Sequence, residues 1–266
     1  MTLHPGSGHA SAPPVPTAAE MRRRLDEVNR RIRDAGGDPG RVRVVAVTKG
    51  FGTAACAAAV AAGQADIGEN YAQELLAKDA ELVAAGGGEA TGTGGVRDRW
   101  IRADQMGAGG RQGRAGIVRW HFLGSIQRRK VGPLGGLVHL WHGVARASEG
   151  EAISRHAPGA QVLVQVDFSG DPGRNGCRPE EAPGLVDRLV GMGLDVRGLM
   201  TVAPLAGPDE ARRAFSGTRR LVDRLGLDEA SMGMSADLEL AVAEGATIVR
   251  VGSSLFGDRP SRPREQ

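Results

Sequence analysis

The sequence predicts a single (β/α)8 TIM-type barrel of the α/β class. Short apolar runs alternate with amphipathic stretches along most of the chain, and the alternation repeats about eight times, as an eight-stranded barrel requires. Polar residues recur where the apolar runs end. An unbroken alternation of this kind implies parallel strands covered by helices. A doubly wound open sheet is the alternative, although no G-x-G-x-x-G fingerprint follows the first predicted strand.

The individual elements follow from periodicity and from residues that begin or end helices. A capping box of Thr17 and Glu20 begins the first helix, and Gly36 ends it. The later predicted helices cover residues 53–62, 71–85, 150–156, 179–191, 208–225 and 235–244. The predicted strands cover residues 42–48, 65–68, 120–123, 137–141, 161–167, 196–200 and 247–251, with a further short segment before Ser231.

One domain accounts for this pattern, and it is predicted to span residues 17–258. Residues 1–16 lack an apolar pattern and are predicted to form a disordered tail, and residues 259–266 a C-terminal tail. Residues 86–116 are about one-third glycine. Because long structureless loops are unusual inside compact domains, this segment is predicted to be a flexible surface insertion.

Composition excludes several classes of function. Net charge is +3, but aromatic residues make up only 3% of the chain, which leaves little for base stacking and argues against a nucleic-acid partner. Cys56 and Cys177 are far apart and lack metal-ligand spacing, so neither a disulfide framework nor a metal site is predicted. With no secretory signal and no long apolar run, the sequence predicts a cytoplasmic protein without a membrane partner.

Lys49 is the residue whose position carries the most chemical information. It ends the apolar run Val-Val-Ala-Val-Thr-Lys, so a parallel barrel delivers its amine to the mouth where functional groups gather. Burial there disfavours the charged form and gives a nucleophilic amine, which forms imines with aldehydes. A surface lysine whose amine reaches out into water is the alternative.

The last predicted strand leads into Arg250-Val-Gly-Ser-Ser-Leu-Phe-Gly, a segment suited to phosphate. Gly252 permits close backbone approach, and Ser253 and Ser254 offer hydroxyl and amide donors. Ser231-Met-Gly-Met-Ser supplies a second loop at the same end of the barrel. Together with a lysine at a strand end, these loops indicate a phosphorylated aldehyde as ligand, pyridoxal 5′-phosphate (PLP).

Six blocks, in this order, resemble the motifs of the pyridoxal-phosphate homeostasis proteins. They are Val-Ala-Val-Thr-Lys (45–49), Ile-Gly-Glu-Asn-Tyr-Ala-Gln-Glu (67–74), Trp-His-Phe-Leu-Gly-Ser-Ile-Gln (120–127), Gly-Leu-Met-Thr (198–201), Ser-Met-Gly-Met-Ser-Ala-Asp (231–237) and Val-Arg-Val-Gly-Ser-Ser-Leu-Phe-Gly (249–257). The resemblance implies the barrel of the alanine racemase N-terminal domain and a role in storing, buffering or delivering PLP, with apo-PLP enzymes as candidate recipients.

The same resemblance implies a role for each cofactor-binding residue. PLP is expected as an aldimine on Lys49, with Asn70 beside it and Arg250 facing the pyridine nitrogen. The residues expected to hold the phosphate are Ser231, Gly252 and Ser253. Arg174 stands where bacterial relatives often carry a second lysine, and an arginine cannot form an imine.

Two other functions compete with the carrier. One is a PLP-dependent enzyme related to amino-acid racemases, and the other is a small-molecule or RNA-binding regulatory module. Racemisation needs an acid/base group on each face of the substrate, but the chain has a single tyrosine, Tyr71, and ends soon after Phe256. We therefore expect a carrier without efficient turnover. His121 and Glu69 are expected in structural contacts, and His142 has no partner pattern.

Overall fold

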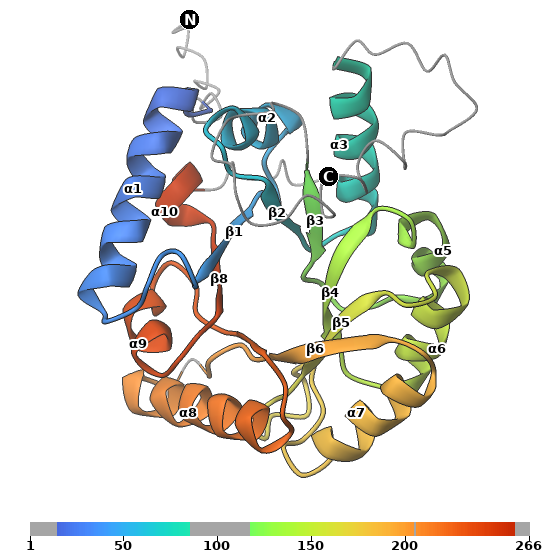
Figure 1. Cartoon of the computed structure of the whole chain (residues 1–266). Helices are drawn as coiled ribbons and strands as arrows, with labels where there is room; N and C mark the ends of the chain where they lie inside the picture. Colours follow the sequence, from blue (N-terminus) through green and yellow to red (C-terminus); the bar gives the residue numbers. More distant parts are fainter. Residues whose placement is uncertain (1–14, 86–117, 205, 259–266) are drawn as a thin grey trace, which may run out of the picture.

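The computed structural model describes residues 15–85, 118–204 and 206–258. Eight parallel strands form a closed barrel in which each strand pairs with the next along the chain and β8 pairs with β1. Figure 1 looks along the barrel, with helices around the strands. The strands are β1 (Arg43–Val47), β2 (Asp66–Glu69), β3 (Arg119–Phe122), β4 (Val138–Val144), β5 (Gln161–Gln165), β6 (Asp195–Met200), β7 (Glu229–Ser231) and β8 (Ile248–Val251). The prediction of a (β/α)8 barrel is confirmed, and an open sheet is excluded.

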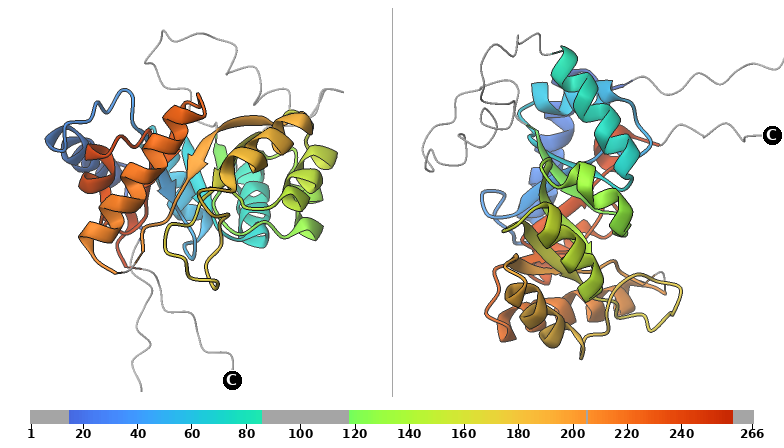
Figure 2. Two further views of the ribbon diagram at one scale, coloured as in Figure 1. Left: turned by 90° about the horizontal axis from the view of Figure 1, so that it is seen from below. Right: turned by 90° about the vertical axis from the view of Figure 1, so that its right-hand side faces the viewer.

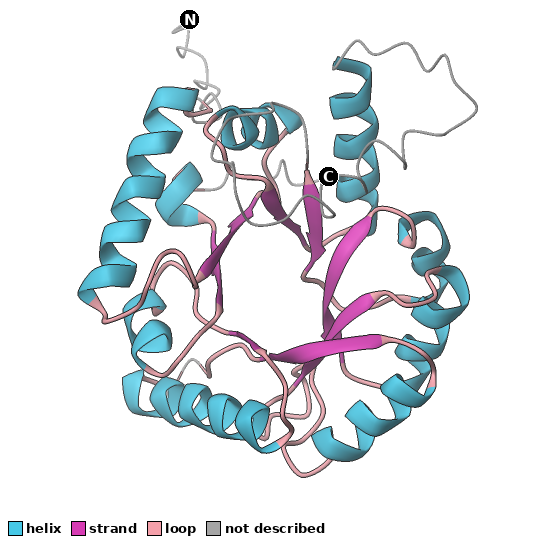
Figure 3. Cartoon of the chain, viewed as in Figure 1, coloured by secondary structure: helices cyan, strands magenta, loops and turns pink. Residues whose placement is uncertain are grey.

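Helices enclose this barrel on its outer side, as the ring of cyan around magenta in Figure 3 and the two side views of Figure 2 show. They are α1 (Ala18–Asp34), α2 (Thr53–Ala61), α3 (Ala72–Ala85), α5 (Val131–Leu134), α6 (Ala147–His156), α7 (Ala182–Gly191), α8 (Pro208–Arg224), α9 (Leu238–Ala243) and α10 (Ser253–Phe256). The sequence did not predict α5, the 3-10 helix η1 (Arg128–Lys130) before it, or α10, because each is too short to show periodicity.

The predicted start of the first helix can be compared with the structure directly. The hydroxyl of Thr17 accepts a hydrogen bond from the backbone N–H of Glu20, so α1 begins at the predicted cap. The carboxylate of Glu20 pairs with Arg24. The predicted insertion at 86–116 and the C-terminal tail at 259–266 lie outside the described residues, as does the N-terminal tail apart from residues 15 and 16.

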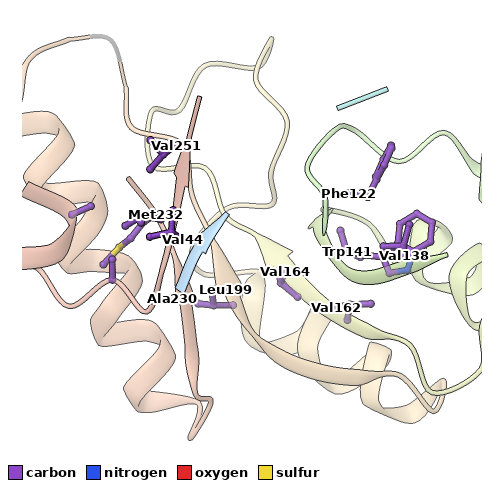
Figure 4. Close-up of a cluster of buried hydrophobic side chains, with 14 of the residues drawn as sticks. Val44, Phe122, Val138, Trp141, Val162, Val164, Leu199, Ala230, Met232 and Val251 are labelled. Atoms are coloured by element: carbon purple, nitrogen blue, oxygen red, sulfur yellow. The ribbon is translucent and has the colours of Figure 1, made fainter. Parts of the chain in front are cut away.

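The larger core lies between the outer face of the strands and the helices. Figure 4 shows part of it, with alternate strand residues directed to that side, among them Val44, Val162, Val164 and Leu199. Trp120 and Trp141 are its largest buried side chains. Because the strands use every second residue for this core, the residues between them must line the lumen.

The lumen is lined by both apolar and polar side chains. Five buried residues from five strands form a separate inner cluster: Val45, Leu140, Leu163, Met200 and Ile248. Buried polar residues of the lumen pair in the sheet register with members of this cluster: His121 with Leu140, Arg250 with Val45, and Ser231 with Met200 and Ile248. His142 lies two residues beyond Leu140 on β4 and is also buried. These polar residues, unlike the apolar cluster, can donate and accept hydrogen bonds inside the barrel.

Among the helices described, none combines the length and the apolarity that a bilayer crossing requires.

Candidate functional site

Lys49 lies in the turn that follows β1, at the carboxyl end of the barrel. Its side chain is half-buried. Val45 belongs to the inner cluster, so the strand alternation continues through Val47 to Lys49 on the lumen side. The turn needs the glycine that follows, because Gly50 has a φ of 78°, a left-handed conformation that side chains disfavour. The predicted position of Lys49 at the barrel mouth is therefore where the structure places it.

Helix α3 anchors the main chain on both sides of Lys49. The Lys78 Nζ donates to the backbone oxygen of Thr48 at 2.8 Å, and the backbone N–H of Gly50 donates to Glu74 Oε2 at 2.9 Å. Glu74 and Lys78 are one helical turn apart, a spacing at which two side chains lie on the same face. The turn that carries Lys49 is thus fixed by two side chains of one helix.

A buried carboxylate completes this support. Glu69, at the end of β2, is fully buried, forms an ion pair with Lys78, and accepts a 2.6 Å hydrogen bond from the Thr48 hydroxyl. Burial raises the pKa of Glu69, and the nearby Lys78 opposes that rise. A structural contact was expected for Glu69 from the sequence, and the ion pair confirms it. Lys78 was not expected at the site, although the Glu-x-x-x-Lys spacing of Glu74 and Lys78 was a usable signal.

The loop after β8 presents two backbone amides to one oxygen. The N–H groups of Gly252 and Ser254 both donate to the Ser235 hydroxyl, at 3.3 and 3.2 Å. Such converging amides are a common way to bind an anion, since they supply donors without a side chain. Because Val251 pairs with Ala46 in the register of β8 and β1, this loop adjoins the end of β1 and hence the turn of Lys49.

Arg250 lies inside the barrel just below this loop. It is 6% exposed, and its Nη1 donates to the Ser231 hydroxyl and its Nη2 to the Thr201 carbonyl, both at 2.8 Å. Burial lowers the pKa of Arg250 to about 10, so the guanidinium remains a cation at neutral pH. The structure thus holds a fixed positive charge in the lumen, one strand away from Lys49.

Ser231 and Asn70 complete the set of predicted residues. The fully buried Ser231 hydroxyl contacts Arg250 and His142, which favours a role beside Arg250 over one in the amide loop; phosphate binding by Ser231 stays a prediction. Asn70 directly follows β2 and is half-buried. Its carbonyl packs against Gly124, where an added Cβ would lie 2.0 Å from the Asn70 oxygen. All the predicted residues therefore gather at the carboxyl half of the barrel.

His142 is a residue whose contacts the sequence analysis did not foresee. Its Nδ1 lies 3.0 Å from the Ser231 hydroxyl, and its Nε2 lies 2.9 Å from Nδ1 of His121. The alternation in β4 was a usable signal, because it places His142 on the same lumen face as the apolar Leu140. The sequence showed no partner pattern for His142, and the structure gives it two hydrogen-bonding neighbours, whereas the expected structural contact of His121 is confirmed.

A cavity of about 430 Å³ lies at the opposite, amino-terminal mouth of the barrel. Its lining includes three arginines, but each is paired with a carboxylate: Arg43 with Glu229, Arg119 with Asp66 and Arg197 with Asp228. These pairs neutralise one another and leave no excess positive charge for an anion. The volume of this cavity would suit a small ligand, but the paired charges argue against an anionic one, and the fixed cation of Arg250 favours the carboxyl end.

Comparisons with known proteins agree with this fold. Residues 19–260 match the family model of the alanine racemase N-terminal domain, which defines the class of barrel. The pyridoxal phosphate homeostasis protein of Pseudomonas aeruginosa is 37% identical over 88% of this chain and 94% of its own. That of Deinococcus radiodurans is 36% identical over 84% of this chain and 92% of its own. The chain belongs to the pyridoxal phosphate homeostasis protein family.

A solved structure extends the comparison to the cofactor of a relative. PipY of Synechococcus elongatus, in a solved structure with PLP bound, is 30% identical and superposes with a TM-score of 0.69. The match covers 89% of this chain and all of PipY. Barrel and cofactor thus occur together in a protein of similar length.

Proposed function

We propose that this chain binds PLP through Lys49 and serves PLP homeostasis by storing, buffering or delivering the cofactor, with apo-PLP enzymes as recipients. The observation that carries the proposal is the meeting of three groups at one end of the barrel: the anchored turn of Lys49, the paired amides of Gly252 and Ser254, and the buried cation of Arg250. Relatives named for PLP homeostasis and the PLP complex of PipY support it.

These residues fit the three chemical features of the cofactor. PLP when bound supplies an aldehyde that condenses with amines and a pyridine ring that withdraws electrons. Lys49 offers the amine, the loop of Gly252 and Ser253 offers amides and hydroxyls for the phosphate, and Arg250 offers an N–H donor for the ring nitrogen. Asn70, at the end of the neighbouring strand β2, lies on the Lys49 side of the site.

The number of lysines in the chain strengthens the choice of Lys49. The whole sequence contains only Lys49, Lys78 and Lys130. The amine of Lys78 is buried and bonded to Glu69 and the Thr48 carbonyl. Lys130 belongs to η1, which follows β3 rather than β8 or β1. Only Lys49 therefore follows the strand that adjoins the amide loop.

Binding without efficient turnover is the form of the proposal that Arg250 favours. A permanent cation beside the ring nitrogen keeps that nitrogen unprotonated, which weakens the ring as an acceptor of electrons from a carbanion. A racemase-like enzyme, the alternative, also needs a second acid/base group opposite Lys49. Tyr71 is the one tyrosine of the chain, and it is 51% exposed at the start of α3. Arg250 and the exposure of Tyr71 both favour a carrier.

The proposal is tested by titrating the protein with PLP and recording the absorbance of the covalent adduct. Lys49→Ala should lose the yellow band, and Lys130→Ala should keep it at unchanged stoichiometry. Arg250→Ala should keep some band but release PLP faster, because the ring loses its charged donor. Equal bands in Lys49→Ala and the wild type would reject Lys49 as the anchor.

A further inference from the structure

A continuous hydrogen-bonded chain of side chains crosses the lumen from β2 to β8. Asp66 Oδ1 lies 2.9 Å from His121 Nε2, and His121 Nδ1 lies 2.9 Å from His142 Nε2. His142 Nδ1 lies 3.0 Å from the Ser231 hydroxyl, which accepts from Arg250. Both histidines and Ser231 are fully buried. The chain therefore joins the amino-terminal half of the lumen to the proposed cofactor site through buried contacts alone.

One end of the chain accepts hydrogen bonds only. Arg119 donates to both oxygens of Asp66, from Nε at 2.8 Å and Nη2 at 2.6 Å. Burial opposes the charge of Asp66, but the hydrogen bonds from Arg119 and His121 outweigh it and hold the pKa of that carboxyl well below its usual range. An ionised carboxylate has no proton to donate, so Nε2 of His121 must carry one.

The ionised Asp66 and the proton on His121 Nε2 determine the donor and the acceptor of each remaining hydrogen bond up to Arg250. A neutral imidazole with a proton on Nε2 accepts at Nδ1, so His142 must donate to His121 from its own Nε2. Nδ1 of His142 is then an acceptor, and the Ser231 hydroxyl donates to it. The Ser231 oxygen is left to accept from the guanidinium of Arg250. All the bonds from Arg250 to Asp66 thus point the same way.

Adding one proton to His121 would reverse the two middle hydrogen bonds, from His121 to His142 and from His142 to Ser231. His121 would donate from both nitrogens, His142 would donate to Ser231 from Nδ1, and the serine oxygen would face two donors. Arg43 and Arg119 lie on the Asp66 side of the pair and Arg250 on the other, and all three disfavour this charge. Burial lowers the pKa of His121 and lowers that of His142 well below its usual range, so the neutral arrangement is the one consistent with the surroundings.

We propose that Asp66, His121 and His142 are positioning residues for Arg250: they fix the Ser231 hydroxyl as an acceptor and so hold the guanidinium in one orientation. The Thr201 carbonyl supplies the second acceptor, and the guanidinium keeps further N–H donors for a ligand. The consequence for PLP rests on the proposed function, whereas the arrangement of protons is a property of the protein without any ligand. A positively charged group held by two buried acceptors is oriented before any ligand arrives.

The first test uses the protein without PLP. In a long-range 15N–1H NMR spectrum of the full chain at pH 7, with signals assigned by replacing each histidine in turn, His121 and His142 should both be neutral and carry their proton on Nε2. A proton on Nδ1 of His142, or a doubly protonated His121, would overturn the proposal. Because this measurement needs no cofactor, it stands even if PLP binding fails.

The second test asks whether the hydrogen-bonded side chains from Asp66 to Arg250 affect the affinity for PLP. Ser231→Ala removes the acceptor of Arg250 and should weaken the Kd for PLP about tenfold, the usual effect of losing one hydrogen bond to a charged group. Thr218→Ala is the matched control, since it removes an equally buried hydroxyl, bonded to the Ala214 carbonyl of α8. Equal Kd values for the two variants would overturn the proposal that the hydrogen-bonded side chains orient Arg250 for PLP.

Discussion

The Lys78 ammonium donates to the backbone carbonyl of Thr48, the residue immediately before Lys49, at 2.8 Å. The same ammonium neutralises Glu69, which is fully buried. The buried Lys78 ammonium therefore both completes an ion pair and fixes the main chain beside Lys49, the proposed PLP anchor. Its removal should affect stability and PLP binding by different routes, and these routes can be separated.

Lys78→Met should lower the free energy of unfolding by about 3–5 kcal/mol, because it leaves the carboxylate of Glu69 buried without its partner. Adding Glu69→Gln should recover much of that loss, since a neutral amide costs less to bury. The rate of adduct formation at Lys49 should stay reduced in the double variant, because the bond to Thr48 is still missing. Urea unfolding and stopped-flow absorbance measure the two effects; full recovery of the rate would contradict the positioning role.

Gly252 offers a substitution that separates ligand binding from folding. A Cβ at this position would lie 3.5 Å from the Val47 oxygen, an ordinary contact, so Gly252→Val should fold with a nearly unchanged Tm. The branched side chain should nevertheless obstruct the amide loop and weaken the Kd for PLP by tenfold or more, about 1.4 kcal/mol. Isothermal titration would show this.

Gly124→Ala provides the contrast. Its Cβ would lie 2.0 Å from the Asn70 oxygen, so backbone must move and the variant should be destabilised. If Gly252→Val binds PLP as tightly as the wild type, the phosphate is not held by this loop.

The barrel could be predicted from the sequence because strand and helix periods alternate along the chain on both sides of residues 86–116. The short elements could not. η1 and α5 together span only seven residues of the connection between β3 and β4, too few for a helical period to appear. Such segments are defined by the space between neighbouring elements, which only the folded chain specifies.

The pH dependence of stability should carry the signature of the buried histidines. The pKa values of His121 and His142 are lower in the folded than in the unfolded chain, so the unfolded chain binds more protons once the pH falls below about 6.5. Stability should therefore be fully present above that pH and decline below it, by up to about 1.4 kcal/mol per pH unit for each histidine.

Urea unfolding between pH 7.5 and 5.5 measures this decline. His142→Gln should flatten it, whereas His156→Gln, which replaces an exposed histidine of α6, should leave it unchanged. A wild-type stability that is constant across this range would contradict the neutral, buried state of the pair.

Site residues that a single strand positions could also be predicted. Lys49 and Arg250 are two such residues, because each lies on or directly after an apolar run. The hydrogen-bonded chain could not. It joins Asp66 of β2, His121 of β3, His142 of β4 and Ser231 of β7, and no local pattern relates residues that far apart. Strand alternation puts each on the lumen face, but only the register of the closed barrel brings their polar atoms within hydrogen-bonding distance.

Turnover of amino acids should be slow even in PLP-loaded protein. Each L-amino acid can be incubated in deuterium oxide while chirality and exchange of the α-hydrogen are followed. We expect rates well below about 1 s⁻¹, the low end of ordinary enzymes, because the Arg250 cation, in its proposed place beside the ring nitrogen, would disfavour carbanion formation. Faster exchange that disappears in Lys49→Ala would promote the racemase-like alternative.

The most direct test of the account is to identify the lysine that carries PLP. The protein is loaded with one equivalent of PLP, reduced with borohydride, digested and mapped by mass spectrometry. With only Lys49, Lys78 and Lys130 in the chain, the assignment among lysines is unambiguous. We predict that the pyridoxyl group is found on the peptide containing Lys49 at close to full occupancy, with Lys78 unmodified. A label distributed equally between Lys49 and Lys130, or absent from Lys49, would contradict the account.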